Sequence, residues 1–341
     1  MSYINEKIFF IPFKDYRKNI GGPSTFMANL ERYLKSRKFK FYSNLRLIKK
    51  TSAIFFPITF DKFFLKYFKE RNLPIIQRLD GIYYPQKHGD GFEKLNLDIK
   101  CIYDNFSTHI IFQSNYCKEQ CFEILGPKPP NSYSIIINGV DKKIFYPPKV
   151  KNLNLLNNKT INFITTGNFR NLDMIEPIII ALDILKNKYN FKFTIIGPIT
   201  NDKIRKFLNR GYIIHIKKLK NKKIADLLRK SDIMLYSHLN PPCPNSVIEA
   251  IACGIPVVGF NSGAMKELLF FSEDLLAEVS NKIFQTYSEF NPNILKDKIE
   301  FCIKNYQMVY QRALKYSYLY NFNDTGQKYL EVFINSFPSS K

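Results

Sequence analysis

Residues 240–260, NPPCPNSVIEAIACGIPVVGF, place groups capable of binding an anion at the start of a predicted helix. The pattern predicts a helix that ends at Gly254 and has Asn245 or Ser246 as its N-cap. The first N–H groups of a helix have no partner within the helix, and the helix dipole adds partial positive charge there. This end of the helix could therefore hold a phosphate or diphosphate.

Glu249 lies about one turn into the same predicted helix and could accept hydrogen bonds from sugar hydroxyl groups. The alternative interpretation is a capped core helix with Glu249 on its exposed flank. Spacing alone leaves both interpretations open.

A second glycine stretch, KNIGGPSTFMANLERYL at 18–34, follows the first predicted strand. Gly21 and Gly22 allow close backbone approach to a ligand, and Pro23 is typical of a helix start. The stretch is neither GxGxxG nor a Walker loop, so a nicotinamide dehydrogenase and a P-loop enzyme are disfavoured.

Apolar strand-like runs alternate with helical patterns along the whole chain, which is typical of βα units around parallel sheets. Ten strands are predicted, at 7–13, 52–59, 73–79, 109–114, 133–138, 160–167, 191–197, 211–216, 232–237 and 255–260. Helices are predicted between them, for example at 173–188 and 221–230, and the tail at about 292–337 has a helical pattern.

A chain of 341 residues favours two domains. We expect an N-terminal α/β domain at 1–148, a linker at 149–160 and a C-terminal α/β domain at 161–315. Residues 316–341 are expected to form a helix that crosses back to the first domain. Ligands of open parallel sheets usually bind beyond the carboxyl ends of the strands.

Four motifs resemble the retaining glycosyltransferases of family 4, and the resemblance spans nearly the whole chain. They are IINGVDKKIFYP (136–147), TTGNFRN (165–171), FTIIGP (193–198) and CPNSVIEAIACGIPVVGFNSGAMKEL (243–268). RLDGIYY (78–84) and IIFQSNYCKEQ (110–120) resemble a bacterial branch of the family. The resemblance implies a GT-B fold, with two Rossmann-like domains facing each other across a cleft, and metal-independent transfer with retention. It also implies that the C-terminal domain binds the nucleotide sugar and that the N-terminal domain binds the acceptor.

The resemblance also assigns roles to single residues. Glu249 matches the second Glu of the motif Glu, seven residues, Glu, which grips the ribose. Arg170 lies near the phosphate-binding Arg of the family and is the first catalytic candidate. The donor-binding candidates are Gly21, Gly22, Gly167, Asn245, Ser246, Val247 and Glu249.

The chain departs from the family at three points. Pro241 stands where the first acid of the motif is expected, so recognition of the donor sugar differs or activity is impaired. The Lys that usually follows the phosphate-binding Arg is missing from 171–176, and the usual His at an N-domain strand end is not evident. Asp80 is the catalytic candidate in place of that His; its alternative role is a turn residue before Gly81.

The formal net charge is +22, and residues 1–75 hold 16 Lys and Arg against 5 Asp and Glu, with Phe and Tyr interleaved. Such a surface would attract an anionic membrane; the alternative is a solvated basic face. No zinc-finger, RRM or KH pattern occurs, so nucleic acid is not expected as a partner. The six Cys and four His have no zinc-ligand spacing, so free thiols and no metal are expected.

The N-terminus has no signal-peptide pattern and no run is long enough to span a membrane, so we expect a cytoplasmic protein, peripheral on the inner face of the membrane. The expected function is transfer of a sugar, such as a hexose, from a nucleotide-diphosphate donor to a glycan or lipid-linked acceptor in polysaccharide or lipopolysaccharide assembly. A nucleotide-sugar epimerase and a catalytically impaired nucleotide-sugar-binding protein remain as alternatives. No cofactor is expected.

Overall fold

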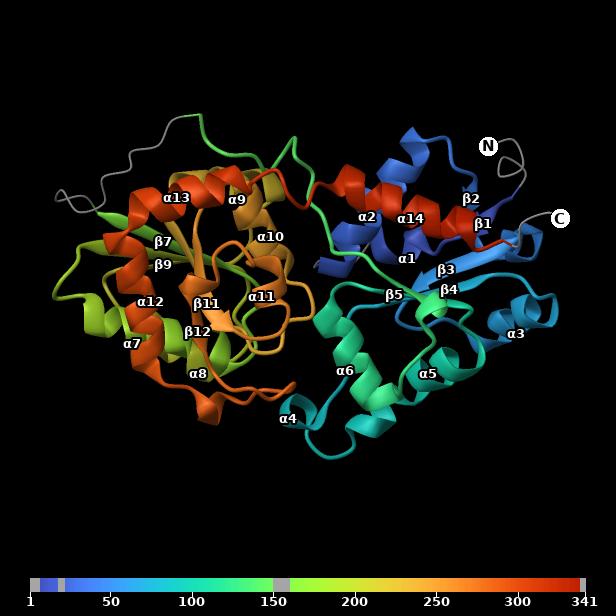
Figure 1. The fold of residues 1–341 in the computed structure, drawn as a ribbon, viewed down its shortest axis with the longest axis horizontal. Helices are drawn as coiled ribbons and strands as arrows, with labels where there is room; N and C mark the ends of the chain where they lie inside the picture. The colour runs from blue at the N-terminus through green and yellow to red at the C-terminus, as the bar shows by residue number, and fades with distance from the viewer. Residues whose placement is uncertain (1–6, 18–21, 150–159, 338–341) are drawn as a thin grey trace. The chain divides into compact units, whose positions relative to one another are not determined.

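The computed structural model describes residues 7–17, 22–149 and 160–337. The chain divides into two compact units (Figure 1). Unit 1 comprises Met1–Gly139 and Phe322–Lys341, and unit 2 comprises Val140–Asn321. Residues 140–148, expected in the first domain, thus group with unit 2, and the last twenty residues group with unit 1.

Unit 1 is built around a six-stranded parallel sheet with the order β2-β1-β3-β4-β5-β6. Its strands are β1 (Phe9–Phe10), β2 (Phe41–Tyr42), β3 (Ala53–Pro57), β4 (Ile75–Leu79), β5 (His109–Phe112) and β6 (Tyr133–Ile135). The residues of β1, β3 and β4 are all buried, as expected for a parallel sheet covered on both faces. Figure 1 shows α2 and α14 on one side of this sheet and α3 and α5 on the other.

The helices of unit 1 connect successive strands, apart from the last one. They are α1 (Phe13–Arg17), α2 (Gly22–Ser36), η2 (Leu45–Lys50), α3 (Lys62–Glu70), α4 (Pro85–His88), α5 (Phe92–Asn105), α6 (Asn115–Leu125), η3 (Pro130–Ser132) and α14 (Phe322–Asn335). Helix α14 packs against α2, and a Cβ at Gly326 would lie 2.5 Å from the Cγ of Tyr33. The Tyr33 hydroxyl donates to Oε1 of Gln327 at 2.9 Å, so the returning segment is fixed by both shape and a hydrogen bond.

Unit 2 has a second six-stranded parallel sheet, with the order β12-β11-β10-β7-β8-β9. Its strands are β7 (Ile161–Thr166), β8 (Phe191–Ile196), β9 (Ile213–Ile216), β10 (Ile233–Tyr236), β11 (Val257–Asn261) and β12 (Leu276–Glu278). The central strands β7 and β10 are almost entirely buried because helices cover both of their faces.

The helices of unit 2 follow the same alternation and end in a helical tail. They are η4 (Leu172–Met174), α7 (Glu176–Leu185), α8 (Asp202–Arg205), η5 (Lys206–Leu208), α9 (Asn221–Lys230), α10 (Asn245–Ala252), α11 (Met265–Leu268), η6 (Glu273–Leu275), η7 (Tyr287–Glu289), α12 (Pro292–Lys304) and α13 (Tyr306–Lys315). In the described part of the chain no helix has the length and apolar character of a membrane span.

Nine of the ten predicted strands contain a strand of the structure, and the tenth, at 255–260, overlaps β11, which ends one residue later at Asn261. The expected helix at 221–230 coincides with α9, whereas the one at 173–188 begins as the 3₁₀ turn η4 before α7. The two strands that were not predicted, β2 and β12, lie at the outer ends of their sheets and have only two and three residues. Such short runs carry too little pattern to be recognised.

Candidate functional site

The carboxyl ends of β7, β8 and β9 lie in register at one edge of the unit 2 sheet. Thr166 pairs with Ile196, and Ile196 pairs with Ile216. The hydrogen-bond ladder continues one residue further, because the N–H of Gly167 donates to the carbonyl of Ile196 at 3.0 Å. The loops that follow these strands therefore start side by side.

Two glycines leave the backbone bare at this edge. A Cβ at Gly197, whose φ is +133°, would lie 1.7 Å from the carbonyl oxygen of Gly167. A Cβ at Gly167 would lie 3.1 Å from Cε1 of His238. Only glycine fits at 197, because the backbones of Gly167 and Gly197 pack directly on each other where β7 and β8 end. The donor-binding role of Gly167 stays a prediction.

Arg170 lies in the loop after β7 with an exposed side chain. The loop is fixed, since Phe169 forms a parallel bridge with Ile199 and the carbonyl of Arg170 accepts from Nδ2 of Asn201 at 3.0 Å. Within the described ranges, the Arg170 guanidinium has no ion pair. It is a fixed-charge cation available to a phosphate at the carboxyl edge.

The loop between β10 and α10 is held by Asn240, a buried residue with φ of +56°. Its Nδ2 donates to the carbonyl of Gln285 at 2.9 Å, and its Oδ1 accepts from the N–H of Gln285 at 2.8 Å. These two bonds stabilise the left-handed conformation, which Asn tolerates better than most residues.

Pro241 is buried in this loop and packs against Gly263. Its carbonyl accepts from the N–H of Ala264 at 2.9 Å, and a Cβ at Gly263 would come within 2.4 Å of that carbonyl oxygen. The side chain at position 241 therefore cannot accept a hydrogen bond from a sugar. The carboxylate that the family resemblance predicts at this position is absent.

Helix α10 begins at Asn245, with Pro244 in the N-cap position and no side-chain cap. The predicted N-cap, Asn245 or Ser246, is therefore wrong by at least one residue. Proline cannot donate, so Pro241, Pro242 and Pro244 reduce the number of N–H groups in front of the helix.

The three predicted donor-binding residues at the start of α10 differ in what they can offer. The N–H of Val247 donates to the carbonyl of Pro244 at 3.1 Å and its side chain is buried, so both groups are engaged within the protein. Asn245 and Ser246 are half-buried. The N–H and hydroxyl of Ser246 have no hydrogen bond within the described part of the chain.

Glu249 is a half-buried carboxyl group in α10. Burial raises its pKa from 4.5 to about 8. Among the described residues none gives its carboxylate a hydrogen bond or an ion pair. A desolvated acceptor without a partner is costly in the folded protein, and such groups are typical of binding sites. The exposed-flank interpretation of Glu249 does not fit this burial.

The carboxyl edge of the unit 1 sheet is different, because its buried charge is fully engaged. The guanidinium of Arg78, at the end of β4, is 1% exposed and pairs with Asp80. Its Nε donates to the hydroxyl of Tyr329 at 2.9 Å, and its Nη2 donates to Oδ1 of Asn138 at 3.1 Å. Its Cζ lies 3.9 Å from the centre of the Phe26 ring.

Asp80 thus serves first as the counter-ion of Arg78. Its side chain is 12% exposed, so little of it faces solvent. Arg78 in turn contacts α2 and α14, and this pairing gives Asp80 a role that neither the catalytic nor the turn interpretation contained. Gly22 forms the first residue of α2, and Gly21 lies outside the described residues.

Sequence reasoning missed Arg78, Asn138 and His238. Arg78 stands in the predicted strand at 73–79, where a charged residue in a buried strand is a signal for a buried ion pair. Asn138 extends the network, since its Nδ2 donates to Oε1 of Gln113 at 2.7 Å. His238 follows β10 and packs on Tyr236 with ring centres 4.3 Å apart.

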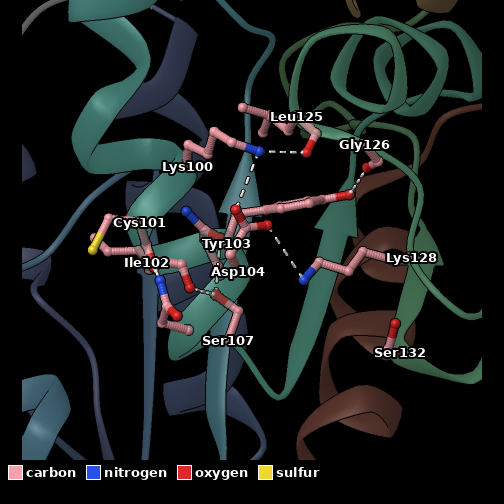
Figure 2. Close-up of polar contacts among 12 residues, drawn as sticks. Lys100, Cys101, Ile102, Tyr103, Asp104, Ser107, Leu125, Gly126, Lys128 and Ser132 are labelled. Carbon is pink, nitrogen blue, oxygen red and sulfur yellow. Dashed lines mark hydrogen bonds and ion pairs between the residues drawn. The ribbon is translucent and has the colours of Figure 1, made fainter.

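Figure 2 shows a polar cluster near the amino end of β5 in unit 1, where α5 ends. Lys100 donates to the carbonyl of Leu125 at 2.9 Å, and the Tyr103 hydroxyl donates to the carbonyl of Gly126 at 2.8 Å. Asp104 pairs with Lys100 at 3.1 Å. These contacts close the turn after α6, and we assign the cluster a structural role.

Residues 160–286 match the family model described as Glycosyl transferases group 1. The matched segment lies in unit 2 and contains Gly167, Arg170 and Glu249. The match supports a glycosyltransferase. No curated protein matches the chain by sequence.

Solved structures share the architecture of both units. The sucrose-phosphate synthase tll1590 from Thermosynechococcus elongatus has a TM-score of 0.74 at 14% identity, over 98% of this chain and 100% of that chain. Anabaena Alr3699/HepE in complex with UDP and glucose has a TM-score of 0.66 at 13% identity, over 97% and 100%. A putative UDP-N-acetylglucosamine 2-epimerase from Listeria monocytogenes has a TM-score of 0.61 at 13% identity, over 98% and 98%.

At these identities the likeness shows the fold alone, and the fold is GT-B, with two Rossmann-like units. The predicted fold class is confirmed. The same fold occurs in a putative epimerase, so it does not decide between the transferase and the epimerase.

Replacing Glu249 with Gln is expected to change how stability depends on pH. Because its pKa is raised in the folded protein, the wild type loses free energy of unfolding as pH rises from 4.5 to about 8. Gln carries no proton to lose, so the variant should gain roughly 1–3 kcal/mol relative to the wild type over this interval. Thermal unfolding at a series of pH values measures the difference. Parallel profiles for the wild type and Glu249→Gln would contradict it; the exposed Glu278→Gln is the control.

Replacing Asp80 with Asn is expected to lower the free energy of unfolding by about 3 kcal/mol, because the buried Arg78 loses its counter-ion. Urea denaturation measures the loss, and Asp90→Asn, at an exposed residue, should stay within about 0.5 kcal/mol of the wild type. If Asp80→Asn were as stable as the wild type, the ion pair would not be needed for the fold. Loss of activity could then be assigned to chemistry.

Proposed function

We propose that this protein is a retaining glycosyltransferase that moves a sugar from a nucleotide-diphosphate donor to a glycan or lipid-linked acceptor without a metal ion. The observation that carries the proposal is the pair of unengaged groups at one edge of unit 2. Glu249 is a desolvated acceptor, and Arg170 is an exposed cation; they follow β10 and β7, which are neighbours in the sheet. Both lie within the segment that matches the family.

The two groups suit the two halves of a nucleoside diphosphate. Ribose hydroxyl groups would donate to the Glu249 carboxylate, which favours its ionised form and offsets the desolvation that raises its pKa. The diphosphate would lie over the bare backbone of Gly167 and Gly197, within reach of Arg170. Anabaena HepE, which shares the fold, was solved with UDP and glucose.

Sugar transfer develops negative charge on the leaving diphosphate and positive charge on the sugar ring. Arg170 and the N–H of Ser246 would stabilise the leaving group as preorganised donors. Loss of one such donor typically costs about 3 kcal/mol of transition-state stabilisation. The paired Asp80 and Arg78 would lie at the acceptor site of unit 1, and the catalytic role of Asp80 would use the exposed part of its carboxylate.

We also propose an acceptor and a location for the enzyme. A lipid-linked acceptor in polysaccharide or lipopolysaccharide assembly would place the enzyme at the cytoplasmic face of an anionic membrane, where its basic surface is attracted. We favour a nucleotide-diphosphate hexose as the donor.

A thermal-shift panel of UDP-, GDP-, ADP- and CDP-sugars tests the site. One donor class should raise the Tm of the wild type by about 5 °C at a hundredfold excess over Kd. Glu249→Ala and Arg170→Ala should both remove the shift, because each loses one half of the donor contact. Lys192→Ala, an exposed cation at the amino end of β8, should keep it.

The outcome separates the alternatives. Transfer is supported if nucleoside diphosphate is released while the donor incubated alone is not converted to another sugar nucleotide. EDTA should leave the rate of this release unchanged. Turnover of the donor alone to its epimer would support the epimerase, and binding without release would support the impaired binding protein. No shift with any donor would contradict the site.

A further inference from the structure

The basic N-terminal quarter of the chain is divided by the sheet of unit 1. Phe55 and Phe56 are neighbours on β3, so their side chains point to opposite faces. Phe55 packs with Leu30 of α2 and Phe333 of α14, whereas Phe56 packs in the cluster that holds Ile48 of η2. Helices α2 and α3 lie on opposite sides of the sheet (Figure 1), so the segment after α2 and the elements η2 and α3 are assigned to different faces.

We call the face formed by η2, α3 and the residue after it the η2–α3 surface. Its exposed side chains are Leu45, Arg46, Lys49, Lys50, Lys62, Phe63, Lys66, Lys69, Glu70 and Arg71. Residues 45–71 hold seven Lys and Arg against two Asp and Glu. Five of these cations, at 46, 49, 50, 69 and 71, have no acidic partner within the described residues.

Contacts around Tyr67 join the two elements into one surface. The hydroxyl of Tyr67 in α3 donates to the carbonyl of Lys49 in η2 at 2.9 Å. The Arg71 guanidinium lies 4.0 Å from the centre of the Tyr67 ring, and Nζ of Lys49 lies 6.0 Å from it. The cations of η2 and α3 are therefore held beside each other.

Large apolar side chains are exposed among these cations. Phe63 is 70% exposed and Leu45 is 49% exposed, although α3 already buries Leu65 and Phe68 in the core. The end of α2 offers a contrast: residues 22–40 hold five Lys and Arg against one Glu, but no large hydrophobic side chain there is exposed among the described residues. Both faces are basic, but only the η2–α3 surface combines its cations with exposed apolar side chains.

We propose that the η2–α3 surface docks the protein on an anionic lipid bilayer. The cations would lie at the level of the lipid phosphate groups, and Phe63 and Leu45 would enter the interface, as in other peripheral membrane surfaces. A nucleic acid would also bind the cations through its phosphates, but it would not explain the two exposed apolar side chains. The inference rests on the membrane association in the proposed function and not on sugar transfer.

Co-sedimentation of the full chain with vesicles tests the surface. Vesicles of equal parts phosphatidylglycerol and phosphatidylcholine should bind the wild type, vesicles of phosphatidylcholine should not, and added salt should weaken binding. The double variant Lys49→Glu/Lys50→Glu should lose at least about tenfold in partition coefficient. Phe63→Ser should weaken binding at both low and high salt, because the lost contribution is apolar.

Lys38→Glu/Lys40→Glu is the matched control, with the same change of charge at the end of α2, and should stay within about threefold of the wild type. Equal losses in both double variants would overturn the proposal, since net charge alone would then explain binding. The absence of phosphatidylglycerol-dependent binding would also overturn it. So would a result in which the same variants lose binding to a duplex oligonucleotide but still bind vesicles. Thermal unfolding checks the fold, and the donor-induced shift in Tm should persist in every variant, which separates this test from that of the transfer function.

Discussion

Parallel strands bring their carboxyl ends to one edge of a sheet, and both candidate polar regions depend on this constraint. Gly167, Gly197 and the loop before α10 follow three different strands, yet the pairing of β7 with β8 and β10 places them along one edge. In unit 1 the same constraint gathers Arg78, Asp80 and Asn138. The fold positions these groups before any of them acts chemically.

The two edges differ in whether their charges are satisfied by the protein. In unit 1 the buried Arg78 is balanced by Asp80, Asn138 and Tyr329, so its polar atoms are committed to the fold. In unit 2 the Glu249 carboxylate is desolvated and the Arg170 guanidinium is exposed, and neither has an ion pair within the ranges described. A site that folds with unengaged charges of both signs is suited to a ligand that supplies hydroxyl groups and phosphates. This difference is the reason for proposing that unit 2 binds the donor.

Much of the fold could be predicted from local pattern, and the site only in part. Buried apolar runs located ten of the twelve strands, and the limits of α9 were predicted to the residue. The N-cap of α10 was misjudged, because it is Pro244, which has no side-chain group for capping, and not Asn245 or Ser246. Arg78 could not be understood from sequence, since Phe26 and Tyr329 lie far from it along the chain and meet it only through α2 and α14. Contacts of that kind depend on tertiary packing, which no local pattern encodes.

Hydrogen exchange of backbone amides, measured by mass spectrometry with and without UDP, tests the donor site most directly. If the nucleotide lies along the carboxyl edge of unit 2, peptides that cover 166–171 and 244–250 should exchange more slowly with UDP, and the Glu249→Ala variant should not show the change. Slower exchange confined to other segments, or unchanged exchange at saturating UDP and at equally saturating GDP, ADP and CDP, would contradict the account.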